Sequence, residues 1–185
     1  MLSKQVKLVS FEKEDKKYHI FSKITVDDEY ITFIYQIDGD LDEIDFREEV
    51  NNNRQWELWK ETCFEVFLKY PDQKWYIEFN FSPSQSWNCF YLSGYRKKCI
   101  EFENISKIDI ESDFSGDHFL LSAKVELTKI KELKRQDLIA GNILIGISAI
   151  VRNKTGKFFH YAIQHGEKKP DFHDDQNFKS DLFSK

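Results

Sequence analysis

The sequence predicts a mainly all-β protein, an antiparallel β-sandwich with at most one or two short helices. Aromatic residues make up 16% of the 185-residue chain, and aromatic and β-branched side chains favour strands. Several segments alternate their side chains at a spacing of two residues, which is the strand period, and turn residues separate these segments. Many short strands with turns between them are typical of a sandwich.

The first clear strand covers residues 30–37. Ile31, Phe33, Tyr35 and Ile37 fall on one side of it, and the other side is more polar. The strand ends at Asp-Gly-Asp in residues 38–40, a strong turn signal.

Residues 62–69 and 74–82 follow as a predicted hairpin with a short turn that begins at Pro71. The alternation in both segments defines two faces. The face expected to be buried in the core carries Phe64, Val66, Leu68, Trp75, Ile77, Phe79 and Phe81, and the other face carries Cys63, Glu65, Phe67, Tyr76, Glu78, Asn80 and Ser82.

The remaining elements complete one domain over residues 1–185. Residues 87–92 can pair as a third strand after the turn at 82–84, and a short helix or helical turn is expected at 128–136 with Thr128 as its N-cap. Further strands are expected at 119–126, 142–151 and 157–163. We see no internal repeat, low-complexity tract or linker.

Charge and composition exclude several classes of protein. The formal net charge is −5, which gives no electrostatic reason to expect a nucleic-acid partner. No stretch approaches the roughly 18 apolar residues of a membrane span, and the N-terminus resembles no signal peptide. We therefore expect a cytoplasmic protein with no membrane partner, and its three scattered cysteines, Cys63, Cys89 and Cys99, to be free thiols.

The polar face of the hairpin is the strongest candidate site. If the strands pair, Glu65, Glu78 and Asn80 share this face with Tyr76, and Trp59 or Trp87 lines it as well. Carboxylate and amide groups bind sugar hydroxyls, while an aromatic plane covers the apolar face of a sugar ring. The alternative is a solvated sheet face whose polar groups pair with lysine or arginine.

Two rival kinds of site remain open. A carboxylate pair could serve a glycan-processing enzyme, which needs an acid and a base or nucleophile at a suitable separation. His160, His165 and His173 could hold haem iron or zinc. Their spacing matches no zinc signature, and no phosphate-binding loop or nucleophile-elbow pattern occurs, so we expect no metal site, no cofactor and no catalytic residue.

An ordered set of motifs resembles the DOMON-like proteins related to the family-9 carbohydrate-binding modules. The resemblance spans roughly residues 56 to 182 and rests on residues 58–68, residues 76–84, Trp87, residues 94–96, residues 169–173 and Phe178. Lys60 stands where the family pattern has an acidic residue, and Gln85 replaces a glycine. Neither departure breaks the sandwich, but both bear on the site.

The resemblance implies a sandwich whose concave face binds a ligand, carbohydrate in the modules and haem or sugar in the wider group. By motif, it makes candidates of Trp59, Glu65, Glu78, Asn80, Ser82, Trp87, Arg96 and His173. We therefore expect a domain that binds a small polar ligand, a saccharide first of all, without catalysing a reaction on it. The sequence indicates neither the oligomeric state nor a protein partner.

Overall fold

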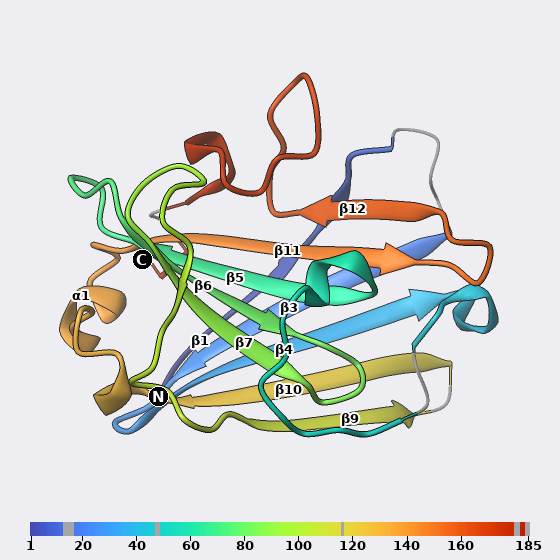
Figure 1. The fold of residues 1–185 in the computed structure, drawn as a ribbon, viewed down its shortest axis with the longest axis horizontal. Coiled ribbons are helices and arrows are strands. Elements are labelled where there is room, and N and C mark those ends of the chain that lie inside the picture. Colours follow the sequence, from blue (N-terminus) through green and yellow to red (C-terminus); the bar gives the residue numbers. More distant parts are fainter. Residues whose placement is uncertain (13–16, 47–48, 116, 180–181, 184–185) are drawn as a thin grey trace.

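The computed structural model describes residues 1–12, 17–46, 49–115, 117–179 and 182–183. Over these residues the chain forms two antiparallel sheets (Figure 1), which confirms the predicted all-β sandwich. One sheet has the strand order β1-β3-β4-β10-β9 and the other β2-β12-β11-β5-β6-β7-β8. The strands are β1 Leu2–Lys7, β2 Val9–Ser10, β3 Tyr18–Val26, β4 Tyr30–Gly39, β5 Cys63–Lys69, β6 Tyr76–Phe81, β7 Trp87–Leu92, β8 Ile100–Glu101, β9 Asp109–Ser115, β10 His118–Glu126, β11 Leu144–Arg152 and β12 Phe158–Ala162.

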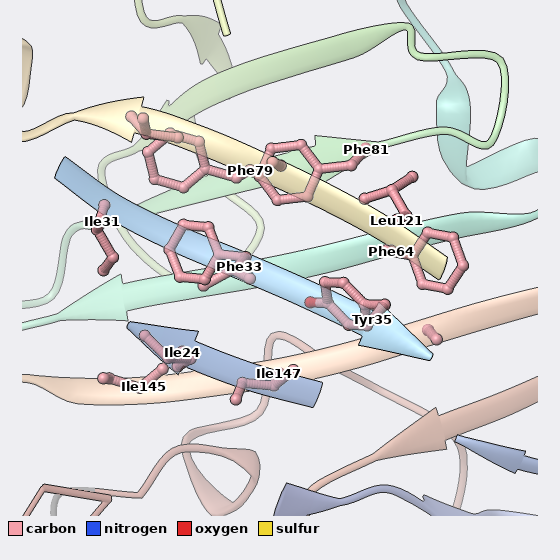
Figure 2. Packing of buried hydrophobic residues seen from close by; sticks show 14 of the residues in the cluster. Ile24, Ile31, Phe33, Tyr35, Phe64, Phe79, Phe81, Leu121, Ile145 and Ile147 are labelled. Carbon is pink, nitrogen blue, oxygen red and sulfur yellow. The ribbon is translucent and has the colours of Figure 1, made fainter. Parts of the chain in front are cut away.

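The core lies between the two sheets and is rich in aromatic rings (Figure 2). Phe33 of β4 packs against Phe79 and Phe81 of β6, with ring centroids 6.0 and 5.9 Å apart. Tyr35, also from β4, packs against Phe64 at 4.7 Å. Its buried hydroxyl donates a hydrogen bond of 2.8 Å to the backbone carbonyl of residue 65, so burial leaves this polar group satisfied.

The face predicted to be buried from the alternation in residues 62–82 is confirmed for its central members. Phe64, Val66, Leu68, Ile77, Phe79 and Phe81 are all fully buried in this cluster, and Trp75 packs against it while partly exposed. All seven predicted strands are present, with ends that differ by two residues or fewer.

The helix predicted at 128–136 is wrong in its extent. A 3-10 turn covers Leu127–Lys129, and α1 is confined to Arg135–Ile139. Thr128 lies inside the 3-10 turn, and its hydroxyl donates to the Glu126 carboxylate instead of capping a helix. Ile130 and Leu133 are buried between the two turns, so packing against the core divides the segment.

Two longer strands that the sequence reading did not include, β3 and β9, belong to the five-stranded sheet. In β3, Tyr18, Ile20, Ile24 and Val26 are buried at a spacing of two or four residues. The hydrophobic alternation in the sequence is interrupted here, because polar Ser22 lies on the buried side and Phe21 on the other side, partly exposed. The short pieces β1, β2 and β8 extend the sheets at their edges.

Gln85 lies in the turn that joins β6 to β7, where the family pattern has glycine. Its φ of +64° is in the left-handed region, which glycine adopts without the Cβ penalty of other residues. Its backbone N–H donates to the Ser82 carbonyl at 2.9 Å, which closes the turn. Glutamine at this position therefore still forms the turn, and β6 still pairs with β7.

Candidate functional site

The candidate site lies on the outer face of the seven-stranded sheet, opposite the core. In the strand register Glu65 of β5 is opposite Asn80 of β6, and Glu78 is opposite Phe67. Alternation therefore brings the two carboxyl side chains to the same face on neighbouring strands, in diagonal positions. The expected sharing of this face by Glu65, Glu78 and Asn80 is observed.

A cavity of about 350 Å³ opens over these carboxyl groups. Four parts of the chain form its wall: the sheet, the 3-10 turn Leu58–Lys60 before β5, the loop between β7 and β8, and the C-terminal segment after β12. The lining residues are Trp59, Glu65, Glu78, Leu92, Arg96, Cys99, Ile150, His160, Pro170, Phe172 and His173. The cavity is thus acidic at its floor and partly aromatic at its wall.

Both floor carboxyls are almost fully buried, with 3% of Glu65 and 5% of Glu78 exposed. Ser148 Oγ donates to Glu65 Oε2 at 3.3 Å, and Asn80 Nδ2 donates to Glu78 Oε1 at 2.8 Å. The Cys63 thiol in turn donates to Asn80 Oδ1 at 3.4 Å. Asn80 is fully buried, so its amide orients Glu78 from below.

Burial raises the pKa of both carboxyl groups. Desolvation raises the pKa of Glu78 to about 7, against the opposing effects of the Asn80 hydrogen bond and the Arg96 charge. Desolvation, together with the negative charge of Glu78, raises the pKa of Glu65 well above its usual value. Two like charges this close in a buried site disfavour double ionisation, so the pair retains a proton at neutral pH.

His173 and Tyr76 form a second hydrogen-bonded unit beside this pair. Tyr76 Oη lies 2.8 Å from His173 Nδ1, and the backbone N–H of Arg96 donates to the same hydroxyl at 3.2 Å. Because the hydroxyl accepts from Arg96, we assign its proton to the bond with Nδ1, which leaves the ring proton on Nε2. Burial and the Arg96 charge lower the pKa of His173 to about 4, so the ring is neutral at pH 7.

Asp171 joins the two segments that border the cavity. Its carboxylate accepts from Tyr95 Oη at 2.5 Å and from Arg96 Nη2 at 2.9 Å, both in the β7–β8 loop, and lies 3.4 Å from Lys169 Nζ. Desolvation opposes ionisation of this group, but these hydrogen bonds outweigh it and lower the pKa of Asp171 to about 2. The ionised carboxylate therefore holds the C-terminal segment against the loop.

The structure brings five of the nine predicted site residues together around the cavity. They are Trp59, Glu65, Glu78, Arg96 and His173. Tyr76 and Asn80 stand beneath them and hydrogen-bond to His173 and Glu78. Trp59 belongs to the 3-10 turn Leu58–Lys60, whose buried Leu58 anchors it to the sheet.

Trp87 and Ser82 lie away from the cavity. The expectation that Trp87 would line the polar face is wrong, because its register partner is Phe81 and both side chains are buried in the core. The guanidinium of Arg54 covers its ring at 4.4 Å. Ser82 is buried in the β6–β7 turn, where its hydroxyl lies 2.9 Å from that of Ser84.

Sequence reasoning missed Phe172 and Cys99 as lining residues. It considered His160 as a structural residue, as a contact to a polar ligand and as a metal or haem ligand, but did not place it in the candidate site. Phe172 lies within the motif of residues 169–173, directly before His173, so that motif was a usable signal. Cys99 carried no signal, because the path of the β7–β8 loop alone brings it to the cavity. His160 Nδ1 lies 2.9 Å from the carboxylate of Glu12.

The described residues contain no cluster of three or more histidine, cysteine, aspartate or glutamate side chains placed to hold a metal ion. His165 is not among the residues that line the cavity, unlike His160 and His173. Its Nε2 lies 2.9 Å from the Val9 carbonyl. Within the same residues, no helix has the length and apolar character needed to cross a bilayer.

The two buried thiols are those of Cys63 and Cys89, and none of the three cysteines is in a disulfide.

Comparison with known proteins supports the fold. No family model matches the chain, and no curated protein matches it. A solved structure described as a "putative carbohydrate-binding protein" from Bacteroides uniformis is similar, with a TM-score of 0.67, 12% identity, and coverage of 96% of this chain and 84% of that one. A family-9 carbohydrate-binding module from Caldicellulosiruptor kristjanssonii, solved with cellotriose, matches with a TM-score of 0.46 and 8% identity over 96% of this chain and 80% of that one.

The class that the fold and the site define is therefore a β-sandwich with a polar, partly aromatic cavity on the outer face of its larger sheet. The chain shares this sandwich fold with the Bacteroides uniformis protein.

Proposed function

We propose that this chain binds a small saccharide in the cavity over Glu65 and Glu78, without catalysing a reaction on it. The observation that carries the proposal is the pair of buried carboxyl groups at the floor of an open cavity with a partly aromatic wall. A volume of about 350 Å³ is at the small end of ligand cavities. It suits one or two sugar rings rather than a polymer lying along a flat surface.

The chemistry of the lining supports a hydroxylated ligand. Ionised Glu78 accepts hydrogen bonds from hydroxyls, whereas a protonated Glu65 and the Arg96 guanidinium donate to them. Trp59 and Phe172 supply apolar surface for the carbon-bound hydrogens of a sugar ring. The cavity therefore offers both hydrogen-bond donors and acceptors, as the hydroxyls of a saccharide require.

The fold likeness is compatible with this proposal, since the Bacteroides uniformis protein is described as carbohydrate-binding. The relation to DOMON-like proteins stays a prediction, and the proposal itself needs neither haem nor a metal ion.

A second candidate, an acid–base enzyme acting on glycans, is favoured by one observation. Glu65 and Glu78 share a cavity, and their environments hold at least one proton on the pair near neutral pH. Pairs of carboxyls in different protonation states supply acid and base in glycoside hydrolysis. Chromatography of each bound sugar after prolonged incubation separates the two functions, because only an enzyme changes the sugar.

A thermal-shift screen of mono- and disaccharides tests the proposal, because a ligand that binds only the folded state raises its apparent stability. Each hit is then titrated against Glu78→Gln and Trp59→Ala, with Glu111→Gln as a matched control on the exposed surface of β9 in the other sheet. We expect about tenfold or greater weakening in the two cavity variants and none in the control. If the two cavity variants bound each sugar as tightly as the wild-type protein and the control do, the binding site would lie elsewhere.

A further inference from the structure

Neither carboxyl group at the cavity floor has a cationic partner within the described part of the chain. No lysine or arginine nitrogen there lies within 4.0 Å of Glu65 or Glu78. His173 Nδ1 lies 3.9 Å from Glu78 Oε2, and in the tautomer assigned above this nitrogen accepts a hydrogen bond from Tyr76. Buried carboxylates are ordinarily paired with a cation or neutralised by a proton.

Each carboxyl also has one oxygen without a protein donor. Ser148 reaches Oε2 of Glu65, and Asn80 reaches Oε1 of Glu78. Among the described residues no hydrogen-bond donor reaches Glu65 Oε1 or Glu78 Oε2. Because both side chains line the cavity, these two oxygens are left to its occupant.

Arg96 lines the same cavity but does not neutralise the pair. Its guanidinium binds the Asp171 carboxylate at 2.9 Å, and half of its side chain is exposed to solvent. The arginine charge is therefore partly compensated by Asp171 within the loop–segment contact. The Arg96 charge still acts against the raised pKa of both carboxyl groups and adds to the lowered pKa of His173, but it forms no ion pair with Glu65 or Glu78 that a ligand cation would have to displace.

We infer that the saccharide of the proposed function carries a protonated amine, whose ammonium group binds between the carboxyl groups of Glu65 and Glu78. The inference rests on the proposed function and names the ligand class within it. An ammonium group has three donors, enough for both free oxygens, and the aromatic wall of Trp59 and Phe172 also favours a cation. A sugar acid would instead place its carboxylate against the acidic floor.

Binding of such a ligand releases a proton to solvent, because the ammonium charge replaces the proton shared by the pair. Cys99, Tyr76 and His173, which face the pair, hold their protonation state near pH 7. Desolvation raises the pKa of Cys99 to about 11 and that of Tyr76 to about 12, and it lowers the pKa of His173 to about 4. The groups around the pair are Cys63 on β5, Tyr76 on β6, His160 on β12, Arg96 and Cys99 in the β7–β8 loop, and Asp171 and His173 in the C-terminal segment.

Calorimetric titration at pH 7 with matched sugars tests the inference. The probes are glucosamine and 6-amino-6-deoxyglucose, with glucose and N-acetylglucosamine as uncharged counterparts. We expect one of the amines to bind at least tenfold more tightly than both uncharged sugars, since a charge-assisted hydrogen bond is added. Repeating the titration in buffers of different ionisation heat should reveal the released proton.

Variants show whether the preference arises at the carboxyl pair. Glu65→Gln and Glu78→Gln should each reduce the amine's affinity about tenfold and bring it near that of the uncharged sugar. Glu111→Gln should keep the wild-type preference. Circular dichroism checks that each variant is folded, and the comparison of amine with N-acetyl sugar on the wild-type protein needs no variant.

Three outcomes would overturn the inference in different ways. Uncharged sugars that bind as tightly as the amines would refute the ammonium site and leave the proposed function standing. If no sugar of either kind bound, both would fail. Ethylamine binding as tightly as the amino sugars would retain a cation site but refute its saccharide ligand.

Discussion

Replacing Glu78 by glutamine removes an ionisable group from the cavity while keeping its size. The folded protein raises the pKa of this carboxyl from 4.5 to about 7, chiefly because burial penalises the charged form. Between these pH values the folded state binds more protons than the unfolded chain, so wild-type stability falls as the pH rises through this window. At about 1.4 kcal/mol per pH unit, the loss contributed by Glu78 is about 3 kcal/mol.

His173 imposes the opposite slope over nearly the same range. Its pKa is lowered from 6.5 to about 4, again mainly by burial. The folded state therefore binds fewer protons than the unfolded chain, and the stability present above pH 6.5 is lost as the pH falls toward 4. The slopes of Glu78 and His173 oppose each other between about pH 4.5 and 6.5, so their two contributions nearly cancel there. The raised pKa of Glu65 adds a slope in the same direction as that of Glu78.

Subtracting the wild-type profile from that of Glu78→Gln removes the contribution of His173 and reports Glu78 together with its effect on the pKa of Glu65. Urea unfolding at pH 4.5, 5.5, 6.5, 7.5 and 8.5 supplies both curves. The variant's free energy of unfolding, relative to wild type, should rise by about 3 kcal/mol from the lowest pH to the highest. Glu111→Gln, an exposed control, should give a flat difference. A flat difference for Glu78→Gln would mean that Glu78 ionises normally in the folded protein, and would refute the reasoning.

Three further predictions follow from burial. Phe79→Ala should lower the free energy of unfolding by about 3–5 kcal/mol, and a loss below about 1 kcal/mol in urea titration would contradict its place in the core. Trp59→Ala should abolish most of the change in tryptophan fluorescence on sugar binding, whereas Trp87→Ala should chiefly lower stability; the reverse pattern would move the aromatic contact to Trp87. In a thiol assay, Cys99 should react in the native protein, slowly because burial raises its pKa to about 11. The other two cysteines should react only after denaturation, and fast native labelling of all three would contradict their burial.

The faces of the central hairpin could be predicted because strand alternation is a local property. Phe64 and Phe79 fall on one face and Glu65 and Glu78 on the other, whatever the rest of the chain does. In residues 87–92 both faces carry large apolar side chains, so alternation alone marked neither as the core. The side of Trp87 was decided by its register opposite Phe81.

By itself, the sequence determined the sandwich class, most of its strands and the shared face of the two glutamates, because these depend on side-chain spacing along short segments. Only the tertiary structure decided that this face is a cavity. The β7–β8 loop and the segment near Asp171, about 75 residues apart in sequence, meet over it through hydrogen bonds to Tyr95 and Arg96. That covering leaves Glu65 and Glu78 almost fully buried, and the resulting desolvation raises the pKa of both groups. Desolvation depends on everything packed around a group, so no pattern of neighbouring residues in the sequence could reveal it.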